Sequence, residues 1–484
     1  MPAGRGQCEE VFLYEILRRI TVEPPFDISA DLDTPVSTYL KLGPLQPRYL
    51  LESVEGGAHL ARYSFLGFGE VIELRLDADG MRVGGKNLPR PQGSAEMLAT
   101  FRRALGETPK LQPELPDLPF TGGLVGVGGY DLVRYFERLP NAPEGLPIPA
   151  TPAAAYMATD SLLVFDHLTR RIALLHAGSA ADRSRLREQI IRLLRGPLPP
   201  MPPQSGYSPP RQSLTEDQYM QAVETGKNYI TQGEIYQIVL SVRFSGQHEL
   251  SPFETYRALR LLNPSPYMFF CDLGDLQVVG SSPEALVKLH GGRASLRPIA
   301  GTRPRGADRE EDIAHEQSLL ADKKENAEHV MLVDLARNDL GRVAAAGSVF
   351  VEPYRSIERY SHVMHIVSGV QGKLAESQDA FDLFAAAFPA GTLVGAPKIR
   401  AMQLIDELEP VRRGVYAGTV GYFGNGGDMD HAIAIRTLVF SDGEYSYQAG
   451  AGIVADSLPL NEYKEVLAKS AILRRALEIA EQGL

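Results

Sequence analysis

Several features that would define a class of protein are scarce in this sequence. No segment approaches the roughly 18 consecutive apolar residues that a membrane-spanning helix requires. The two cysteines, Cys8 and Cys271, are too few for a disulfide framework or a thiolate metal cage. Positive charge is also scarce, because 49 Lys and Arg residues face 60 Asp and Glu residues and leave a net charge of −11, which is unfavourable for binding a nucleic-acid backbone. The first ten residues hold no apolar stretch that could act as a secretory signal. These absences favour a globular, cytoplasmic enzyme that acts on small molecules.

Proline marks the clearest division of the chain. Seven of the residues in 196–213 are proline, a density that excludes helix and central strand and favours extended backbone. We therefore predict a strand-rich N-terminal region over 1–195, a linker over 196–213 and a second domain over 214–484. Thr215 and Gln218 have the spacing of a capping box, which predicts that a helix begins directly after the linker.

The spacing of apolar residues predicts the main elements on both sides of this linker. Strands are expected at 161–165, 171–175, 236–242, 267–271 and 276–280, and helices at 183–195 and 312–337. The strands and helices alternate irregularly. This pattern favours an α+β fold built from antiparallel sheets over a repeating βαβ series.

Two motifs suggest a ligand site but have simpler explanations. The glycine-rich segment 122–129 lacks the GK[ST] ending of a phosphate-binding loop, so a structural, glycine-rich strand edge is the better prediction. His362 and His365 lack the glutamate of an HExxH zinc motif. We expect packed or hydrogen-bonded histidines there.

Two predicted helices each carry a pair of carboxylates. Glu325 and Glu328 form one pair, and Glu462 and Glu465 form the other; residues three apart share a helix face. Carboxylates that converge from two helices suit a hard cation such as Mg²⁺, and Lys469 lies on the same face as Glu465. From spacing alone, solvated helix faces with ordinary ion pairs remain the stronger explanation.

Five segments resemble the chorismate-utilising enzyme family. These segments are PIAGTRPRG (298–306), EHVMLVDLARND (328–339), GTLVGAPK (391–398), AIRT (434–437) and GAGIVADS (450–457). They follow the family order between about residues 233 and 469. The resemblance implies the family fold, in which antiparallel β-sheets pack as a sandwich with helices on the outside.

The resemblance also implies roles for particular residues. Glu328 and Glu465 would ligate Mg²⁺, supported by Glu325 and Glu462, and the metal would hold the ring carboxylate of chorismate. The positions that match substrate contacts of the family are Ala300, Gly301, Thr302, Tyr416, Arg436, Gly450, Ala451, Gly452 and Lys469. Among them, a guanidinium fork and consecutive glycine-rich amides suit carboxylate binding.

Three further positions match residues near the reacting ring. Glu284 corresponds to the general acid that protonates the departing ring hydroxyl, a task that requires a raised pKa at neutral pH. His365 and Thr392 match positions beside the ring in anthranilate synthases. His365 is the candidate for assisting the loss of pyruvate.

Two positions separate the branches of this family. Gln237 stands where the branches that add water, such as isochorismate and salicylate synthases, have a lysine base, and glutamine cannot abstract a proton from water. Ala300 stands where aminodeoxychorismate synthases have a lysine nucleophile. The resemblance therefore favours the anthranilate synthase branch, which forms anthranilate and pyruvate from chorismate and ammonia in the first committed step of tryptophan biosynthesis. A 2-amino-2-deoxyisochorismate synthase, or a component of an aminodeoxychorismate synthase, remains the alternative.

The ammonia implies a partner. Neither Cys8 nor Cys271 lies on the glycine-flanked turn that a glutaminase nucleophile requires. A separate glutamine amidotransferase subunit, component II of such enzymes, is therefore expected. A non-catalytic scaffold of the same fold is disfavoured, because all four glutamates, Arg436 and Lys469 are present.

Segments from both halves resemble the regulatory site of this branch. These are LLES (50–53), RYSFLG (62–67) and NPSPYM (263–268). Ser53, Pro266, Tyr267 and Met268 match positions of a tryptophan-binding inhibitory site. A plain domain interface is the alternative, and feedback inhibition would require that L-tryptophan stabilise an arrangement that binds chorismate poorly.

Overall fold

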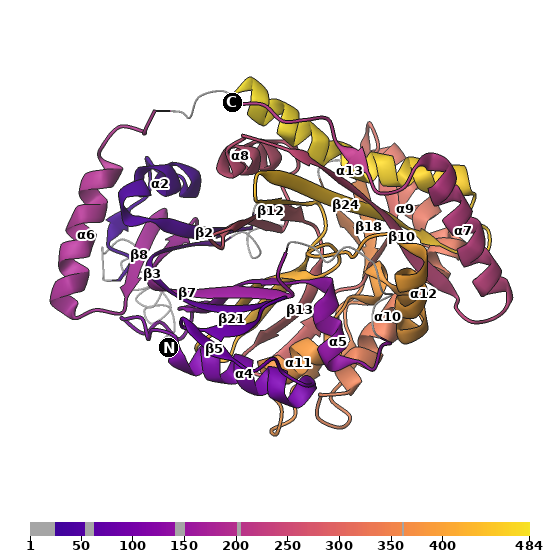
Figure 1. Cartoon of the computed structure of the whole chain (residues 1–484), viewed down its shortest axis with the longest axis horizontal. Helices are drawn as coiled ribbons and strands as arrows, with labels where there is room; N and C mark the ends of the chain where they lie inside the picture. The colour runs from indigo at the N-terminus through magenta and orange to yellow at the C-terminus, as the bar shows by residue number, and fades with distance from the viewer. Residues whose placement is uncertain (1–24, 54–61, 141–150, 201–204, 361–362) are drawn as a thin grey trace, which may run out of the picture.

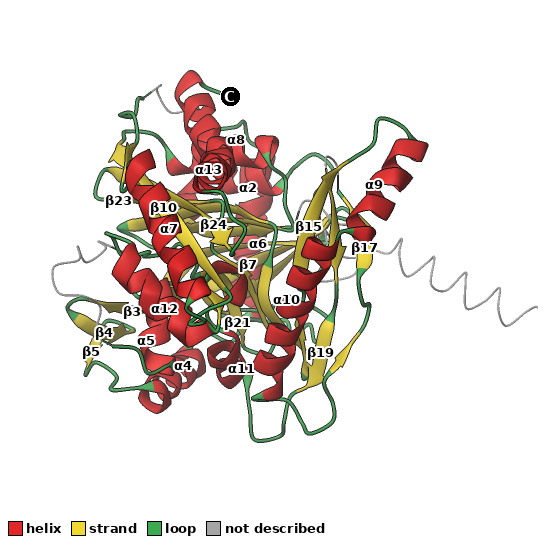
Figure 2. Ribbon diagram, turned by 90° about the vertical axis from the view of Figure 1, so that its right-hand side faces the viewer, coloured by secondary structure: helices red, strands yellow, loops and turns green. Residues whose placement is uncertain are grey.

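Antiparallel strands make up the centre of the protein. The computed structural model describes residues 25–53, 62–140, 151–200, 205–360 and 363–484. Within these ranges 21 strands are linked by hydrogen bonds into one extended, folded sheet, and three more form a small sheet in the order β15–β18–β17. Most helices lie around the outside of the strands (Figures 1 and 2). The predicted α+β fold with packed antiparallel sheets is confirmed.

The elements before the proline-rich segment are mainly strands. The strands are β1 (Ile28–Ser29), β2 (Pro47–Glu52), β3 (Tyr63–Asp77), β4 (Gly80–Val83), β5 (Lys86–Leu88), β6 (Gly123–Gly128), β7 (Ala154–Asp166) and β8 (Arg171–His176). The helices are α2 (Pro35–Lys41), α4 (Ser94–Glu107), α5 (Val133–Phe136) and α6 (Ala180–Leu194), with 3-10 turns η1 (Gly43–Leu45) and η2 (Tyr130–Leu132).

The elements after it contain the longer helices. The strands are β9 (Arg211–Gln212), β10 (Gln237–Gln247), β11 (Tyr267–Asp272), β12 (Leu276–Ser282), β13 (Ala285–His290), β14 (Arg293–Leu296), β15 (Ile299–Pro304), β16 (Phe350–Val351), β17 (Ser356–Arg359), β18 (Val363–Val367), β19 (Val370–Lys373), β20 (Gly395–Ala396), β21 (Thr419–Gly424), β22 (Met429–Ile433), β23 (Thr437–Ser441) and β24 (Glu444–Ile453). The helices are α7 (Glu216–Thr231), α8 (Pro252–Leu262), α9 (Arg309–Ala321), α10 (Lys323–Gly341), α11 (Ala380–Ala387), α12 (Lys398–Leu408) and α13 (Pro459–Gln482), with the 3-10 turn η3 (Gly391–Leu393).

Local sequence signals place most of these elements correctly. The Thr215 hydroxyl oxygen accepts from the backbone amide of Gln218, and the side-chain oxygen of Gln218 accepts from the backbone amide of Thr215, so α7 begins where the capping box predicts. The expected strands at 161–165 and 171–175 lie in the β7–β8 hairpin. Helix α6 begins before the predicted residue 183, because Ser179 caps it.

The expected single helix over 312–337 is wrong. The structure has α9 and α10 there, separated at Asp322, whose backbone is extended (φ −68°, ψ 113°). The Asp322 carboxylate accepts hydrogen bonds from the amides of Lys324 and Glu325. An N-cap inside the apolar pattern therefore starts a second helix.

The glycine-rich segment is a strand, but the prediction that it forms a sheet edge is wrong. Strand β6 pairs with β7 on one side and β21 on the other. A Cβ atom on Gly126 would lie 2.1 Å from the Ala155 carbonyl oxygen, and one on Gly123 would lie 2.1 Å from the Phe423 carbonyl oxygen. The glycines allow the neighbouring strands to approach closely.

Strand pairing joins the two halves of the chain. Strand β2 pairs with β11, with Leu50 opposite Phe270, and β6 pairs with β21. The end of the proline-rich segment forms the two-residue strand β9 beside β10. The division of the chain into two domains joined by a linker over 196–213 stays a prediction.

Helix α13 connects the outer layer to the sheet. It packs against β24, α7 and α8, and it buries Tyr463, Val466, Leu473 and Leu477 (Figure 1). Its other face carries the predicted residues Glu462, Glu465 and Lys469. Neither α13 nor any other helix in the described ranges is long and apolar enough to cross a membrane.

Candidate active site

Strands β10 and β24 form the floor of the site. In their antiparallel register Val239 faces Gly452 and Ser241 faces Gly450. A Cβ atom on Gly452 would lie 2.6 Å from Nε2 of Gln237, and one on Gly450 would lie 2.8 Å from the hydroxyl oxygen of Tyr416. The glycines therefore let the Gln237 amide and the Tyr416 hydroxyl lie directly against β24. Ala451, between the glycines, is buried.

Helix α13 places a cation above this floor. The Lys469 ammonium donates to the Gly450 carbonyl oxygen at 3.2 Å and forms an ion pair with Glu465 at 2.6 Å. The side chains of Lys469 and Glu465 remain 50% and 47% exposed, so this contact is open to solvent. An exposed ion pair of this kind is easily exchanged for another partner.

Helix α10 brings the second carboxylate pair to the same place. Burial raises the pKa of Glu328, the negative charges of Glu325 and Glu465 raise it further, and Lys324 and Lys469 oppose the shift. Burial and the charge of Glu465 also raise the pKa of Glu462. Glu328 and Glu465 are therefore electrostatic neighbours across the gap between α10 and α13.

This donor set fits Mg²⁺. Grouped carboxylates resist joint ionisation, and a divalent cation with a preference for oxygen ligands relieves their repulsion. In the parts of the chain that the structure describes, however, no three His, Cys, Asp or Glu side chains form a ready metal cage. Mg²⁺ is commonly held by one or two carboxylates, with waters and an anionic ligand in the other positions. Glu328 and Glu465 would then hold the ion only together with the substrate.

Glu284 lies between β12 and β13 and faces Thr392. The Thr392 hydroxyl donates to Oε1 of Glu284 at 3.1 Å. Burial raises the pKa of Glu284 to about 7, although the Thr392 hydrogen bond and the charge of Lys469 act in the opposite direction. A carboxyl group with this pKa holds a proton near neutral pH and can transfer it.

His365 lies on β18, beside β15. Its Nδ1 is 2.9 Å from the Gly301 carbonyl oxygen and 3.2 Å from the Thr302 hydroxyl. Because a carbonyl only accepts, Nδ1 carries the proton and Nε2 of the neutral ring is an acceptor. Burial lowers the pKa of His365, and the nearby charge of Arg436 lowers it further. The ring is therefore a neutral base at pH 7.

Strand β15 connects His365 to the carboxylates. Gly301 has φ +66°, and a Cβ atom there would lie 3.1 Å from Oε2 of Glu325. Ala300 is buried and lies opposite Ile366 in the β15–β18 pair. The structure thus brings the predicted catalytic, substrate and metal residues into one connected region. His362 and Cys8 lie outside the described residues.

Sequence analysis missed one buried ion pair below the site. Arg413 and Glu409 are 1% and 3% exposed, and Nη2 of Arg413 is 2.7 Å from Oε1 of Glu409. Their spacing of four residues resembles an ordinary surface pair on a helix. No local signal indicates that this pair is buried.

A second cavity lies at the junction of the two halves. Its volume is about 420 Å³, and Ser53, Pro266, Tyr267 and Met268 all line it. Strands β2 and β11 form one wall, with Met268 opposite Glu52. The four residues predicted for the regulatory site therefore share one cavity.

The cavity is separated from Glu284 by a single turn of chain. Pro283 and Ala285 line the cavity, whereas Glu284, between them, faces Thr392. Arg297 also lines the cavity and contributes to the pocket around Glu284. The cavity and Glu284 are therefore adjacent through the two residues that flank Glu284 in the chain.

Comparison with known proteins assigns the chain to a family. The family model of the chorismate binding enzymes matches residues 46–475. Anthranilate synthase component 1 of Pseudomonas aeruginosa is 46% identical over 95% of this chain and 96% of its own length, and that of Thermus thermophilus is 46% identical over 94% and 97%. The crystal structure of anthranilate synthase component I from Streptococcus pneumoniae superposes with a TM-score of 0.76 at 38% identity, covering 87% of this chain and 94% of that one. The menaquinone-specific isochorismate synthase of Escherichia coli shares the fold, with a TM-score of 0.67 at 20% identity over 96% of this chain and 98% of that one. The chain therefore belongs to the chorismate-binding enzyme family and, within it, to the anthranilate synthase component 1 group.

Proposed function

We propose that the chain is a Mg²⁺-dependent lyase that converts chorismate and ammonia into anthranilate, pyruvate and water. The observation that carries this proposal is Glu284, a carboxyl group with a pKa of about 7 that accepts a hydrogen bond from Thr392 beside Lys469. The similarity to anthranilate synthase components over nearly the whole chain supports the same reaction. We place the reaction in the cytoplasm, at the first committed step of tryptophan biosynthesis.

The positions of the side chains suggest a series of proton transfers. Glu284 donates its proton to the ring hydroxyl, which leaves as water while ammonia adds to the ring carbon ortho to the carboxylate. The ammonium group so formed returns a proton to the Glu284 carboxylate. His365 then accepts the proton of the aminated ring carbon through Nε2 as the bond between the ring and the ether oxygen breaks, and this proton passes to the methylene carbon of the departing enolpyruvate, which becomes pyruvate. Mg²⁺, when bound, would neutralise the ring carboxylate. Lys469, Arg436 and the Gly450–Gly452 amides would hold the substrate carboxylates.

Two residues support amination over the alternative reactions. The Gln237 side chain lies against Gly452 on the floor and has no basic group with which to activate water. Ala300 provides no amine for covalent attack on the ring. The neutral His365 ring favours completion of the elimination over release of the aminated intermediate, because it provides a base near Arg436.

A separate glutamine amidotransferase component is proposed as the source of ammonia. In the described ranges the only cysteine is Cys271, which is buried in β11, and burial raises the pKa of its thiol. A thiol with a raised pKa is a poor nucleophile at neutral pH. The chain would therefore use free ammonia when it is assayed alone.

The product assay tests this proposal. Purified chain, chorismate, Mg²⁺ and ammonium are incubated at alkaline pH, and the products are separated and identified. Fluorescent anthranilate and an equal amount of pyruvate are expected. Accumulation of 4-amino-4-deoxychorismate, isochorismate or the aminated intermediate as the main product would contradict it.

We also propose that L-tryptophan binds the cavity lined by Ser53, Pro266, Tyr267 and Met268 and inhibits the enzyme. The cavity is large enough for an amino acid with an indole ring, at about 420 Å³. The chain contains no tryptophan, so indole fluorescence anisotropy in a titration reports the ligand alone. An anisotropy that does not change on adding the protein would contradict binding.

A further inference from the structure

A buried ion pair lies directly below the proposed active site. Arg413 donates from Nε to Oε2 of Glu409 at 3.0 Å and from Nη2 to Oε1 at 2.7 Å. Both side chains are almost completely buried. A bidentate pair fixes the plane of the guanidinium as well as its position.

The remaining donors of Arg413 hold two segments of the site. Nη1 donates to the Leu393 carbonyl oxygen and Nη2 to the Val239 carbonyl oxygen, each at 2.7 Å. Leu393 directly follows Thr392, the residue that donates to Glu284. Val239 lies on β10 opposite Gly452. One guanidinium therefore sets the distance between the turn η3 and the floor of the site.

The Glu409 carboxylate holds the same strand, β10, two residues further along. Its Oε1 accepts from the Ser241 amide at 2.9 Å and from the Ser241 hydroxyl at 2.7 Å. Nε2 of Gln448 on β24 donates to the same hydroxyl oxygen at 2.8 Å. Ser241 lies opposite Gly450, whose amide is a predicted substrate contact.

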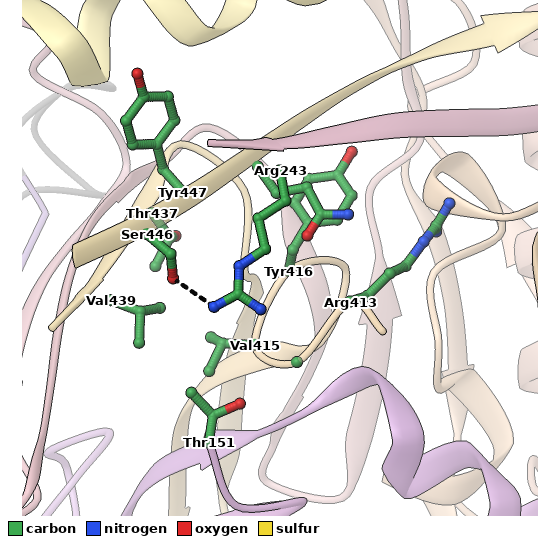
Figure 3. A pocket seen from close by; sticks show the side chains of 11 residues that line it. Thr151, Arg243, Arg413, Val415, Tyr416, Thr437, Val439, Ser446 and Tyr447 are labelled. Carbon is green, nitrogen blue, oxygen red and sulfur yellow. Dashed lines mark hydrogen bonds between the residues drawn. The ribbon is translucent and has the colours of Figure 1, made fainter. Parts of the chain in front are cut away.

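Arg413 also contacts the loop that carries Tyr416. The Tyr416 amide donates to the Arg413 carbonyl oxygen at 3.1 Å, and the guanidinium carbon lies 5.6 Å from the centre of the Tyr416 ring. Figure 3 shows these two residues beside Arg243, whose Nη2 donates to the Ser446 hydroxyl at 3.2 Å.

We infer that Arg413 and Glu409 are positioning residues, which hold the Thr392–Glu284 contact, Tyr416 and the Gly450–Gly452 amides in the geometry that the reaction requires. This inference rests on the proposed function. Burying two charges costs desolvation energy that an apolar pair would not, so stability alone does not explain the pair. Its side-chain hydrogen bonds end on the carbonyl oxygens of Leu393 and Val239 and on the amide and hydroxyl of Ser241, which lie next to Thr392 or opposite the glycines of β24.

Arg413→Lys tests this inference because lysine keeps the charge but lacks the planar fork. The matched control is Arg134→Lys, which alters a neighbouring ion pair of Arg134 with Asp406 (2.7 and 2.8 Å) that joins α5 to α12. We expect Arg413→Lys to lower kcat about 100-fold, the effect of misplacing reacting groups by about 1 Å. Arg134→Lys should change kcat less than about threefold, because the hydrogen bonds of Arg134 end on Asp131, Pro140 and Asp406, and none of these is a predicted site residue.

The pH profile separates positioning from loss of stability. The Thr392 hydrogen bond lowers the pKa of Glu284, so a displaced η3 turn should let that pKa rise. The alkaline limb of kcat, normalised to free ammonia, should therefore move to higher pH in Arg413→Lys and stay in place in Arg134→Lys. Destabilisation alone moves neither limb.

Ser241→Ala provides a second variant if Arg413→Lys does not fold. It removes the hydroxyl that bonds both Glu409 and Gln448, and kcat should fall about fivefold relative to Arg134→Lys. Suppose that the wild-type chain makes anthranilate, but Arg413→Lys or Ser241→Ala has the same kcat and the same alkaline pH limb as Arg134→Lys. This result would overturn the inference, and the proposed function would still stand.

Discussion

The proposed active site and the proposed regulatory cavity differ in how their carboxylates are arranged and paired. In the active site burial raises the pKa of Glu328, and the negative charges of Glu325 and Glu465 raise it further. In the cavity Asp430 is neutralised by Lys288 at 3.1 Å and accepts from the Tyr267 hydroxyl at 3.0 Å. The active site gathers several carboxylates around Glu328, although Glu465 also pairs with Lys469. In the cavity, by contrast, Asp430 pairs with Lys288 and Tyr267.

This difference indicates which ligands each region suits. Gathered carboxylates suit a divalent cation, and a cation held there could in turn hold an anionic substrate. A cavity with internally paired charges suits a ligand without net charge, such as a zwitterionic amino acid. The two regions meet at residues 283–285. The Glu284 carboxyl group faces the active site, and its neighbours Pro283 and Ala285 line the cavity.

The largest expected effect comes from removing the charge of Glu328. Glu328→Gln should abolish Mg²⁺-dependent turnover, because the metal loses a carboxylate while the fold keeps its shape. The measurement is the rate of anthranilate formation as Mg²⁺ is varied. Glu188→Gln, on the exposed face of α6, is the control and should behave as wild type. A Glu328→Gln variant with a nearly normal rate would remove this residue from the metal site.

Glu284→Gln should have the next largest effect. Loss of a general acid typically lowers a rate by about 100- to 10,000-fold, so we expect kcat to fall about 1000-fold. In wild type the rate per free ammonia should decrease as pH rises above about 7, where Glu284 loses its proton. The residual rate of the variant should not show this decrease. If the rate of Glu284→Gln still decreases above about pH 7 as in wild type, the decrease must come from another ionisable group.

Filling the cavity should affect inhibition without affecting chemistry. Ser53→Phe places a ring in the space proposed for the indole, and overpacking typically costs about 1–3 kcal/mol. The L-tryptophan concentration for half inhibition should therefore rise about 10- to 100-fold, while kcat without inhibitor stays near wild type. Ser184→Phe on the surface of α6 controls for the added ring. Unchanged inhibition in Ser53→Phe would place the inhibitor elsewhere.

The smallest expected effect is on stability. The pKa of Glu284 rises from its ordinary value of 4.5 to about 7 on folding, so the folded state loses stability relative to the unfolded state as pH rises between these values. Glu284→Gln cannot lose this proton. The variant should therefore melt at a higher temperature than wild type at pH 8 and at a similar temperature at pH 4. A difference of equal size at both pH values would show that burial does not perturb this carboxyl group.

Local signals in the sequence predicted the fold better than they predicted the site. The Thr215 capping box and the β7–β8 hairpin involve neighbouring residues, so their geometry follows from short-range chemistry. The position of β6 between two strands depends on pairing with residues almost 300 positions away, which apolar spacing does not encode. The break at Asp322 was missed because an aspartate within a helical pattern can face solvent or cap a new helix.

Only the family resemblance predicted that the site residues would lie close together. Spacing alone favoured solvated helix faces for Glu325 and Glu328, since it cannot show that the charge of Glu465 on α13 acts on Glu328 on α10. The pKa of Glu284 depends on burial by distant segments, and the burial of Glu409 and Arg413 has no signal in the chain. In each case tertiary packing, and not local pattern, gives the residue its chemistry.

The most direct test of the central claim is Mg²⁺ binding measured by calorimetry with and without chorismate. If Glu328 and Glu465 share an ion that also grips the substrate, chorismate should raise the affinity for Mg²⁺ about tenfold or more, and Mg²⁺ should raise the affinity for chorismate by the same factor. Glu328→Gln should lose this coupling, whereas Glu188→Gln should retain it. Equal Mg²⁺ affinity with and without chorismate in wild type, or coupling that persists in Glu328→Gln, would contradict the account.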